Sequence, residues 1–155
     1  MKRLLTSAAL AALAVPAAAD MDAARALIAQ YSELPTFEAP GEAFDAQACM
    51  ADKKMFVIPL TNANPFNVAI GEGMAQAAEM VGFELRNWET QLDPTQWVQG
   101  INTAVAEGYD LIDFQGGLPP ELVAPQIGEA REAGLKVTAT HNWDATTQEV
   151  PDFMD

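Results

Sequence analysis

Two neighbouring stretches decide the fold of this chain: Met55-Phe56-Val57-Ile58-Pro59-Leu60 and, directly after it, Thr61-Asn62-Ala63-Asn64-Pro65-Phe66. The first is an apolar run of the length of a buried strand, and the second contains the polar and proline residues of a turn. From Phe66 the apolar residues recur at helical spacing as far as Val81, and Gly82 closes the helix. A strand, a turn and a helix in this order form the repeating unit of folds with a parallel sheet.

The same pattern recurs along the rest of the chain. Further strands are predicted at residues 83–88, 109–114 and 136–140, with one helix starting at Asp93-Pro94 and another after Pro119-Pro120. We therefore predict an α/β fold: an open parallel sheet of four strands with flanking helices and right-handed crossovers. Pro59 fits an interior strand poorly because proline cannot donate to a ladder, so the strand either frays there or ends its pairing there.

Polar and aromatic side chains follow the strands at their carboxyl ends. Ligands of open parallel sheets bind beyond those ends, so these side chains are candidates for a site. The candidates are Asn62, Asn64, Phe66, Gln115, His141, Asn142, Trp143 and Asp144. Amides and carboxylates beside flat aromatic rings suit a sugar, whose hydroxyls donate and accept and whose ring faces are apolar.

Each candidate also has a structural interpretation. Asn64 precedes a proline and is a common turn residue, and His141 could be a hydrogen-bonded structural histidine. Trp143 could cover a linker, and Gly116-Gly117 after Gln115 could be a simple turn. Trp88 and Trp97 are interpreted as structural.

Composition excludes several classes of function. The 155 residues include 22 acidic and 8 basic ones, a formal net charge of −14, which repels nucleic acid and anionic lipid surfaces. Cys49 is the only cysteine, so no internal disulfide framework or zinc knuckle is expected. With one histidine and no nucleotide or nucleophile motif, neither a metal, a cofactor nor catalysis is predicted: Gly71-x-Gly73 lacks a third glycine and falls inside a helix.

The N-terminus reads as a secretory leader over residues 1–19. A basic start at Met1-Lys2-Arg3 is followed by an apolar run over 4–15, and Pro16-Ala17-Ala18-Ala19 provides a cleavage pattern. The run is too short to span a bilayer, so no direct membrane insertion is expected and the mature chain is placed in the periplasm. Residues 20–52 are predicted as a short helix over 22–31 and an extended arm.

Taken together, these features resemble the ribose-type (type I) periplasmic sugar-binding proteins of ABC importers. The resemblance rests on the leader, on Asn64-Pro65-Phe66 after the first strand, on the Asp93-Pro94 helix start, and on Ala133-Gly134-Leu135-Lys136-Val137 before the fourth strand. It covers residues 53–144 and implies the first lobe of a two-lobed protein of flavodoxin-like topology. It also implies that Asn64 bonds a sugar hydroxyl and that Phe66 covers a sugar face.

The sequence departs from the family in two respects. His141 and Asn142 stand where sugar-binding members often have an Asp-Arg pair, and Trp143 and Asp144 follow as replacements for stacking and hydroxyl acceptance. Family members are about twice as long, so residues 145–155 are interpreted as the start of the crossing to a second lobe, with the chain truncated there.

The resulting functional hypothesis is a protein that captures a small polar solute, a sugar or polyol, and presents it to an ABC permease in the inner membrane. The alternative is a periplasmic sensory module that passes the signal to a receptor or histidine kinase. A third alternative is an enzyme of flavodoxin-like fold.

Overall fold

The computed structural model describes residues 21–34, 36, 38–39, 41–144 and 147–155 and divides the chain into two units, residues 1–43 and 44–155. The predicted leader lies outside the described residues. In the first unit, helix α1 (Met21–Gln30) is exposed along its whole length. None of the described helices is both long enough and apolar enough to cross a membrane.

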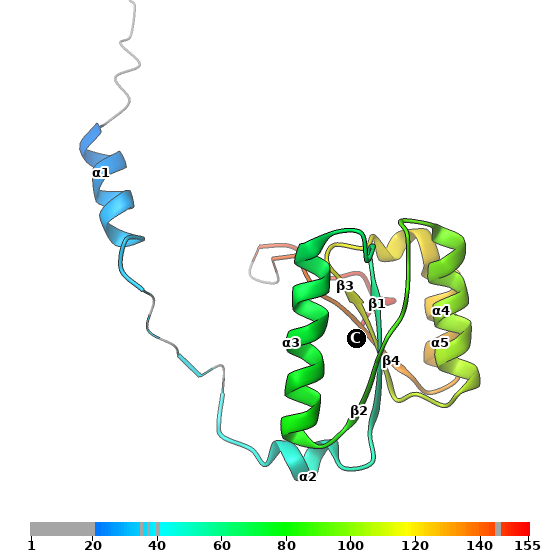
Figure 1. Cartoon of the computed structure of the whole chain (residues 1–155). Coiled ribbons are helices and arrows are strands. Elements are labelled where there is room, and N and C mark those ends of the chain that lie inside the picture. The colour runs from blue at the N-terminus through cyan, green and yellow to red at the C-terminus, as the bar shows by residue number, and fades with distance from the viewer. Residues whose placement is uncertain (1–20, 35, 37, 40, 145–146) are drawn as a thin grey trace, which may run out of the picture. The chain divides into compact units, whose positions relative to one another are not determined.

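The second unit is a parallel sheet between two layers of helix. Its strands are β1 (Lys54–Pro59), β2 (Glu84–Asn87), β3 (Leu111–Gln115) and β4 (Lys136–Ala139), in the spatial order β2-β1-β3-β4. Helix α3 (Pro65–Val81) lies on one face, while α4 (Pro94–Ala106) and α5 (Ala124–Glu132) lie on the other (Figure 1). The predicted α/β fold is thus confirmed, and the order of the strands reverses between β1 and β3.

Local signals fix where the helices begin. The Asn64 side chain accepts the Phe66 N–H at 3.0 Å and caps α3, and the Asp93 side chain caps α4 through the Thr95 N–H at 2.9 Å. In both helices proline takes the first position, where its missing N–H costs nothing. The third helix differs, because a 3-10 turn, η1 (Pro120–Val123), leads into α5.

The structure has one helical turn in the segment that the sequence predicted to be an extended arm. Helix α2 (Ala46–Met50) forms there, because Asp45 caps it by accepting the Ala48 N–H at 3.0 Å. A helix of five residues is too short to show a hydrophobic period, so the sequence pattern could not reveal it.

The core lies between the sheet and helices α4 and α5. Phe56, Ile58, Ile112 and Phe114 point to this side and are fully buried. They pack against a second set of buried side chains that includes Trp97, Ile101, Val123 and Ile127. Burying each large apolar side chain contributes about 1.5–3 kcal/mol, so this layer holds the sheet in place.

The other sheet face is more polar. Alternation along the strands turns Val57, Asp113 and Thr138, which are neighbours in register, away from the core. One step nearer the carboxyl ends stand Pro59 and Gln115. Chemistry-bearing side chains therefore collect on the α3 face and at the carboxyl ends of the strands.

Pro59 is accommodated as the last residue of β1. Val57 accepts the Trp88 N–H at 2.8 Å, so the odd-numbered residues of β1 bond toward β2. Strand β2 ends at Asn87, opposite Val57, so the N–H that Pro59 lacks has no ladder partner to lose.

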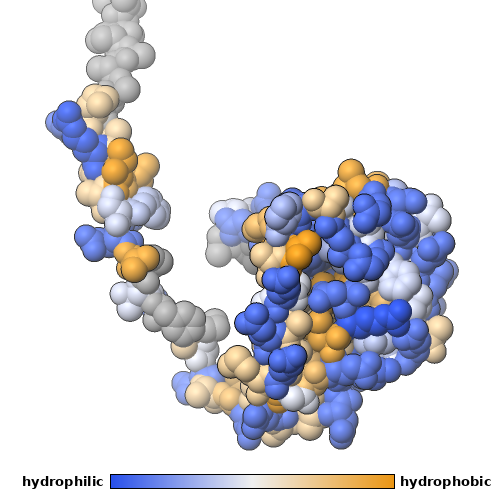
Figure 2. Space-filling view, viewed as in Figure 1, coloured by the Kyte–Doolittle hydropathy of each residue, from blue (hydrophilic) through white to orange (hydrophobic). Residues whose placement is uncertain are grey.

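The compact unit extends to the last residue of the chain. Met154 is buried in the core cluster, and Asp155 lies along β4, where its N–H donates to the Val137 carbonyl at 2.9 Å. Its carboxylate in turn accepts the Val137 N–H at 2.9 Å. On the face seen in Figure 2 this unit carries mostly hydrophilic residues, in keeping with its acidic composition.

Candidate functional site

Three loops meet beyond the carboxyl ends of the strands. They follow β1, β3 and β4, and the seven residues predicted to contact a solute lie in these loops or in the strand end or helix start beside them: Asn64, Phe66, Gln115, His141, Asn142, Trp143 and Asp144. Hydrogen bonds tie the loops together, since Gly117 N–H donates to the Thr140 carbonyl at 3.3 Å and Asn142 Nδ2 donates to the Leu118 carbonyl at 2.9 Å. We call this surface the carboxyl-end rim.

Phe66 and His141 form an aromatic pair at the rim. Their ring centroids lie 5.3 Å apart with the planes at 76°, an edge-to-face arrangement. Phe66, in the first turn of α3, is 52% exposed, and His141 is exposed as well. The pair therefore presents flat apolar surface to solvent.

His141 is held in an unusual backbone conformation. Its φ is +65°, in the left-handed region that costs a non-glycine residue about 1 kcal/mol or more. Strain of this kind persists only where the surrounding structure enforces it, and it concentrates at functional sites.

Two of the predicted contacts also have structural tasks. Asn64 uses its side-chain oxygen to cap α3, which leaves its NH2 group for other partners. Gln115 is only 1% exposed, and its Nε2 donates to the Asn67 carbonyl at 2.9 Å, which joins the end of β3 to the first turn of α3.

The last three predicted residues lie on the loop after β4. Trp143 is half-buried and packs against the core cluster, and with Asn142 it lines a small cavity of about 190 Å³ beside Pro119 and Pro120. The Asp144 carboxylate is exposed and accepts the Thr147 hydroxyl at 2.9 Å. Trp88 and Trp97 pack in or against the core, as interpreted from the sequence.

Sequence reasoning missed a buried acid, Asp113. Its side chain is 3% exposed, one oxygen accepts the Thr138 hydroxyl at 2.8 Å, and the other has no hydrogen-bond partner within the described residues. Burial raises the pKa of Asp113 to about 6, against the opposing effects of the Thr138 hydrogen bond and the nearby His141. The signal was a charged residue inside a strand that otherwise reads as buried.

The structure also has a polar pocket, between α3 and the end of β2, that was not predicted from the sequence. This β2 pocket has a volume of about 400 Å³ and adjoins the rim through Gln115 and Asn62. Its other polar lining residues are Asn67, Glu72, Asn87 and Glu89. Asn67 is 3% exposed, and its side-chain oxygen lacks a hydrogen-bond partner within the described residues.

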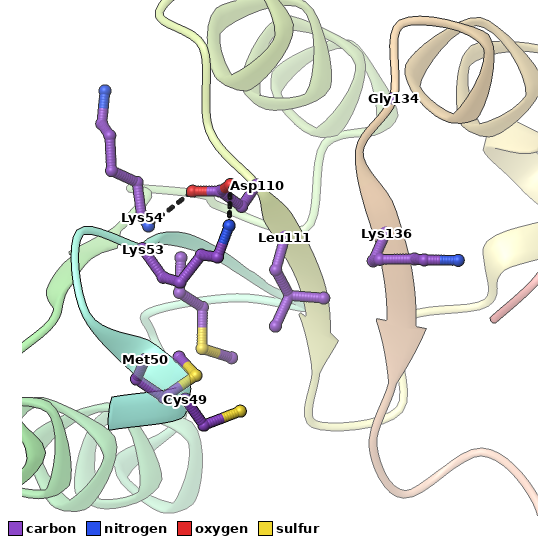
Figure 3. Close-up of a pocket in the computed structure, with 9 residues that line it drawn as sticks. Cys49, Met50, Lys53, Lys54, Asp110, Leu111, Gly134 and Lys136 are labelled. Carbon is purple, nitrogen blue, oxygen red and sulfur yellow. Dashed lines mark hydrogen bonds and ion pairs between the residues drawn. The ribbon is translucent and has the colours of Figure 1, made fainter. Parts of the chain in front are cut away.

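Another cavity, of about 350 Å³, lies at the opposite, amino ends of the strands. Figure 3 shows that the Lys53 Nζ and the Lys54 backbone N–H donate to the Asp110 carboxylate there, and Cys49 and Leu111 also line the cavity. Lys53 Nζ pairs with Asp110 at 3.1 Å and Lys136 Nζ with Asp155 at 3.1 Å. Within each of these two ion pairs the charges neutralise each other. None of the predicted solute contacts lines this cavity.

Several solved structures that resemble this chain are solute-binding proteins of ABC transporters. They include a Burkholderia graminis protein of an ABC transporter in complex with D-arabinose, 25% identical with a TM-score of 0.52, and a Mycobacterium smegmatis one with bound glycerol, 24% identical with a TM-score of 0.53. The chain has the fold of one lobe of a type I periplasmic sugar-binding protein. LsrB from Clostridium saccharobutylicum in complex with AI-2 is likewise similar, at 24% identity and a TM-score of 0.51.

The likeness covers one lobe only. The alignments take in 56–58% of this chain and 26–31% of the three solved chains, so this chain spans about a third or less of their length. No family model and no curated protein matches the sequence. The lobe fold expected from the sequence is confirmed, while the ligand roles of the seven rim residues stay predictions.

Proposed function

We propose that this lobe captures a small polar solute, a sugar or polyol, outside the cytoplasm for an ABC importer. The observation that carries the proposal is the exposed Phe66–His141 pair beside the amides of the carboxyl-end rim. The similar proteins from Burkholderia graminis and Mycobacterium smegmatis hold D-arabinose and glycerol, and a leader over residues 1–19 would export the chain.

The rim chemistry suits such a solute. The Phe66 ring offers an apolar surface to the C–H groups of a sugar, and the NH2 group of Asn64 can donate to a hydroxyl. His141 can donate or accept at its ring nitrogens. The strand order reverses between β1 and β3, the place where open α/β sheets bind ligands.

In this proposal a second lobe covers the other side of the solute, and closure of the two lobes marks the loaded state for the permease. One lobe alone leaves half of the solute hydrated. We therefore expect the 155-residue chain to bind weakly, with a Kd of about 1 mM.

Isothermal titration against D-arabinose, allitol and glycerol tests the proposal. We expect saturable binding of at least one solute to the chain, and a loss of about fivefold or more in affinity for Phe66→Ala. Phe44→Ala is the matched control, since Phe44 is 75% exposed and is not among the rim residues. No binding of any solute at millimolar concentrations, or equal losses in the two variants, would contradict the proposal.

A further inference from the structure

The β2 pocket is built to accept hydrogen bonds. Three of its amide side chains donate a hydrogen bond to a backbone carbonyl. Asn67 Nδ2 donates to the Thr61 carbonyl at 3.0 Å, and Asn87 Nδ2 donates to the Gly71 carbonyl at 3.3 Å. Gln115 Nε2 donates to the Asn67 carbonyl at 2.9 Å. A carbonyl can only accept, so each of these bonds fixes which end of the amide faces it. The three amide oxygens are left without a hydrogen-bond donor in the part of the chain that the structure describes, and the Asn67 oxygen is buried beside Gly116.

Two carboxylates add negative charge to the same pocket. Glu72 comes from α3 and Glu89 from the loop after β2, and both line the cavity. Neither has a salt bridge among the described residues. A ligand in this pocket therefore meets amide oxygens and negative charge, beside the NH2 group of Asn62 and the second N–H of the other three amides.

The basic side chains that the structure describes form their ion pairs and hydrogen bonds away from the pocket. All described Lys and Arg side chains have partners outside the pocket: Arg25 with Asp22, Lys53 with Asp110, Lys54 with the Glu107 carbonyl, Arg86 with Glu107, and Arg131 and Lys136 with Asp155. Lys54 and Lys136 start strands and Lys53 precedes Lys54, so all three lie at the far end of the sheet from the pocket. No basic side chain of this unit lines the pocket, so its carboxylates are not neutralised from within.

The volume of the pocket indicates a small organic ligand and not a single metal ion. About 400 Å³ lies in the range of sites for small organic ligands, and it is far more than one coordinated metal ion fills. The described residues contain no group of three or more His, Cys, Asp or Glu side chains placed to hold a metal. An ammonium group, with three donors and one positive charge, matches the acceptors and the charge.

We propose that the β2 pocket binds a primary ammonium group and that the solute of this lobe is an amino sugar or amino polyol. The inference rests on the proposed function, because the hydroxyl-bearing part of the same molecule is placed over Phe66 and His141. Asn62 and Gln115 line the pocket and belong to the rim, so the pocket adjoins the surface proposed to bind the hydroxyl groups. The net charge of −14 also raises the local concentration of a cationic solute.

The test is a pair of NMR titrations of the full chain with D-glucosamine and D-glucose, which differ by one amine. D-glucosamine is expected to shift the side-chain amide signals of Asn67, Asn87 and Gln115, and D-glucose is expected to leave those of Asn67 and Asn87 in place. Signals of Phe66 and His141 report on the rim separately. Shifts at the rim without amine-dependent shifts in the pocket would overturn this inference and leave the proposed function standing.

Variants test the charge directly. Glu72→Gln and Glu89→Gln keep the size of the side chain and are each expected to weaken D-glucosamine binding about tenfold. Glu79→Gln, at an exposed position on the same helix α3 outside the pocket, is the control and should bind as the parent chain does. Equal affinities in all three variants, or displacement of the amine by CaCl2 at equal concentration, would show that the site does not select an ammonium group.

Discussion

The Phe66 and His141 rings pack edge to face with centroids 5.3 Å apart, although one residue follows β1 and the other follows β4. Two strands that are not neighbours in the sheet thus contribute to a single aromatic surface. The strain at His141, with φ at +65°, allows that surface to be tested apart from the stability of the fold.

Replacing His141 by glycine should separate binding from folding. Glycine adopts positive φ without strain, so His141→Gly is expected to leave the free energy of unfolding unchanged or to raise it by at most about 1 kcal/mol. Solute affinity should fall, because the ring that supports Phe66 is lost. His141→Asn, which also tolerates this conformation, is the control for strain, and denaturant unfolding with titration calorimetry measures both quantities. Loss of stability in both variants would refute a role confined to binding.

Asn64 can be tested for its two tasks separately. Serine is as good a helix cap as asparagine, so Asn64→Ser should keep stability within about 0.5 kcal/mol, whereas Asn64→Ala should cost about 1 kcal/mol. If the NH2 group of Asn64 donates to a solute hydroxyl, both variants lose affinity by a similar factor. A serine variant with unchanged affinity would leave Asn64 as a helix cap only.

Asp113 should make the lobe less stable as the pH rises. Its folded-state pKa is about 6 and lies above the ordinary value of 3.8, so its contribution is intact below pH 4. This contribution to the free energy of unfolding is lost as the carboxyl ionises, and the total loss between pH 4 and pH 7 is about 3 kcal/mol. Asp113→Asn should remove this dependence, so the variant should be the more stable chain at pH 7.5 and close to the parent at pH 4. Thermal unfolding of both chains is measured at each pH, so that the contributions of other groups cancel in the difference between the two. A difference in stability that did not change with pH would refute the account.

Gly116 is expected to be the least replaceable glycine of the rim. Its φ is +74°, and a Cβ built there would lie 2.1 Å from the Asn67 side-chain oxygen. Gly116→Ala should therefore cost about 2–4 kcal/mol through strain and displacement of Asn67. Gly128→Ala in α5 is the control, since nothing lies within 4 Å of its added Cβ and alanine favours a helix. Denaturant midpoints measure both, and similar midpoints would contradict the close packing of Asn67 against Gly116.

The lobe fold could be predicted because its local signals agree. The run 55–60, the Asp93-Pro94 helix start and the apolar spacing of residues such as Trp97 and Ile101 all point to strands and helices where the structure has them. Helix α2 was missed because one turn shows no period. The η1 turn was likewise invisible, because Pro119-Pro120 signals only that a helix is near.

The site was only partly predictable, for a different reason. Side chains after strand ends can be found from the sequence, because parallel topology gathers them at one edge. Asn67 and Asn87 could not, since their importance comes from tertiary contacts: Asn87 bonds the Gly71 carbonyl, and the Asn67 carbonyl accepts from Gln115. Asp113 could have been flagged, because a carboxylate between Ile112 and Phe114 is out of place in a buried strand.

The most direct test of the central claim is to map a bound solute by NMR. With D-arabinose or an amine-bearing sugar added to millimolar concentration, the account predicts shifts that cluster on Phe66, Gln115 and His141 at the carboxyl ends of the strands. Shifts confined to the amino-end cavity around Met55 and Leu111, with the signals of Phe66 and His141 unmoved, would contradict it.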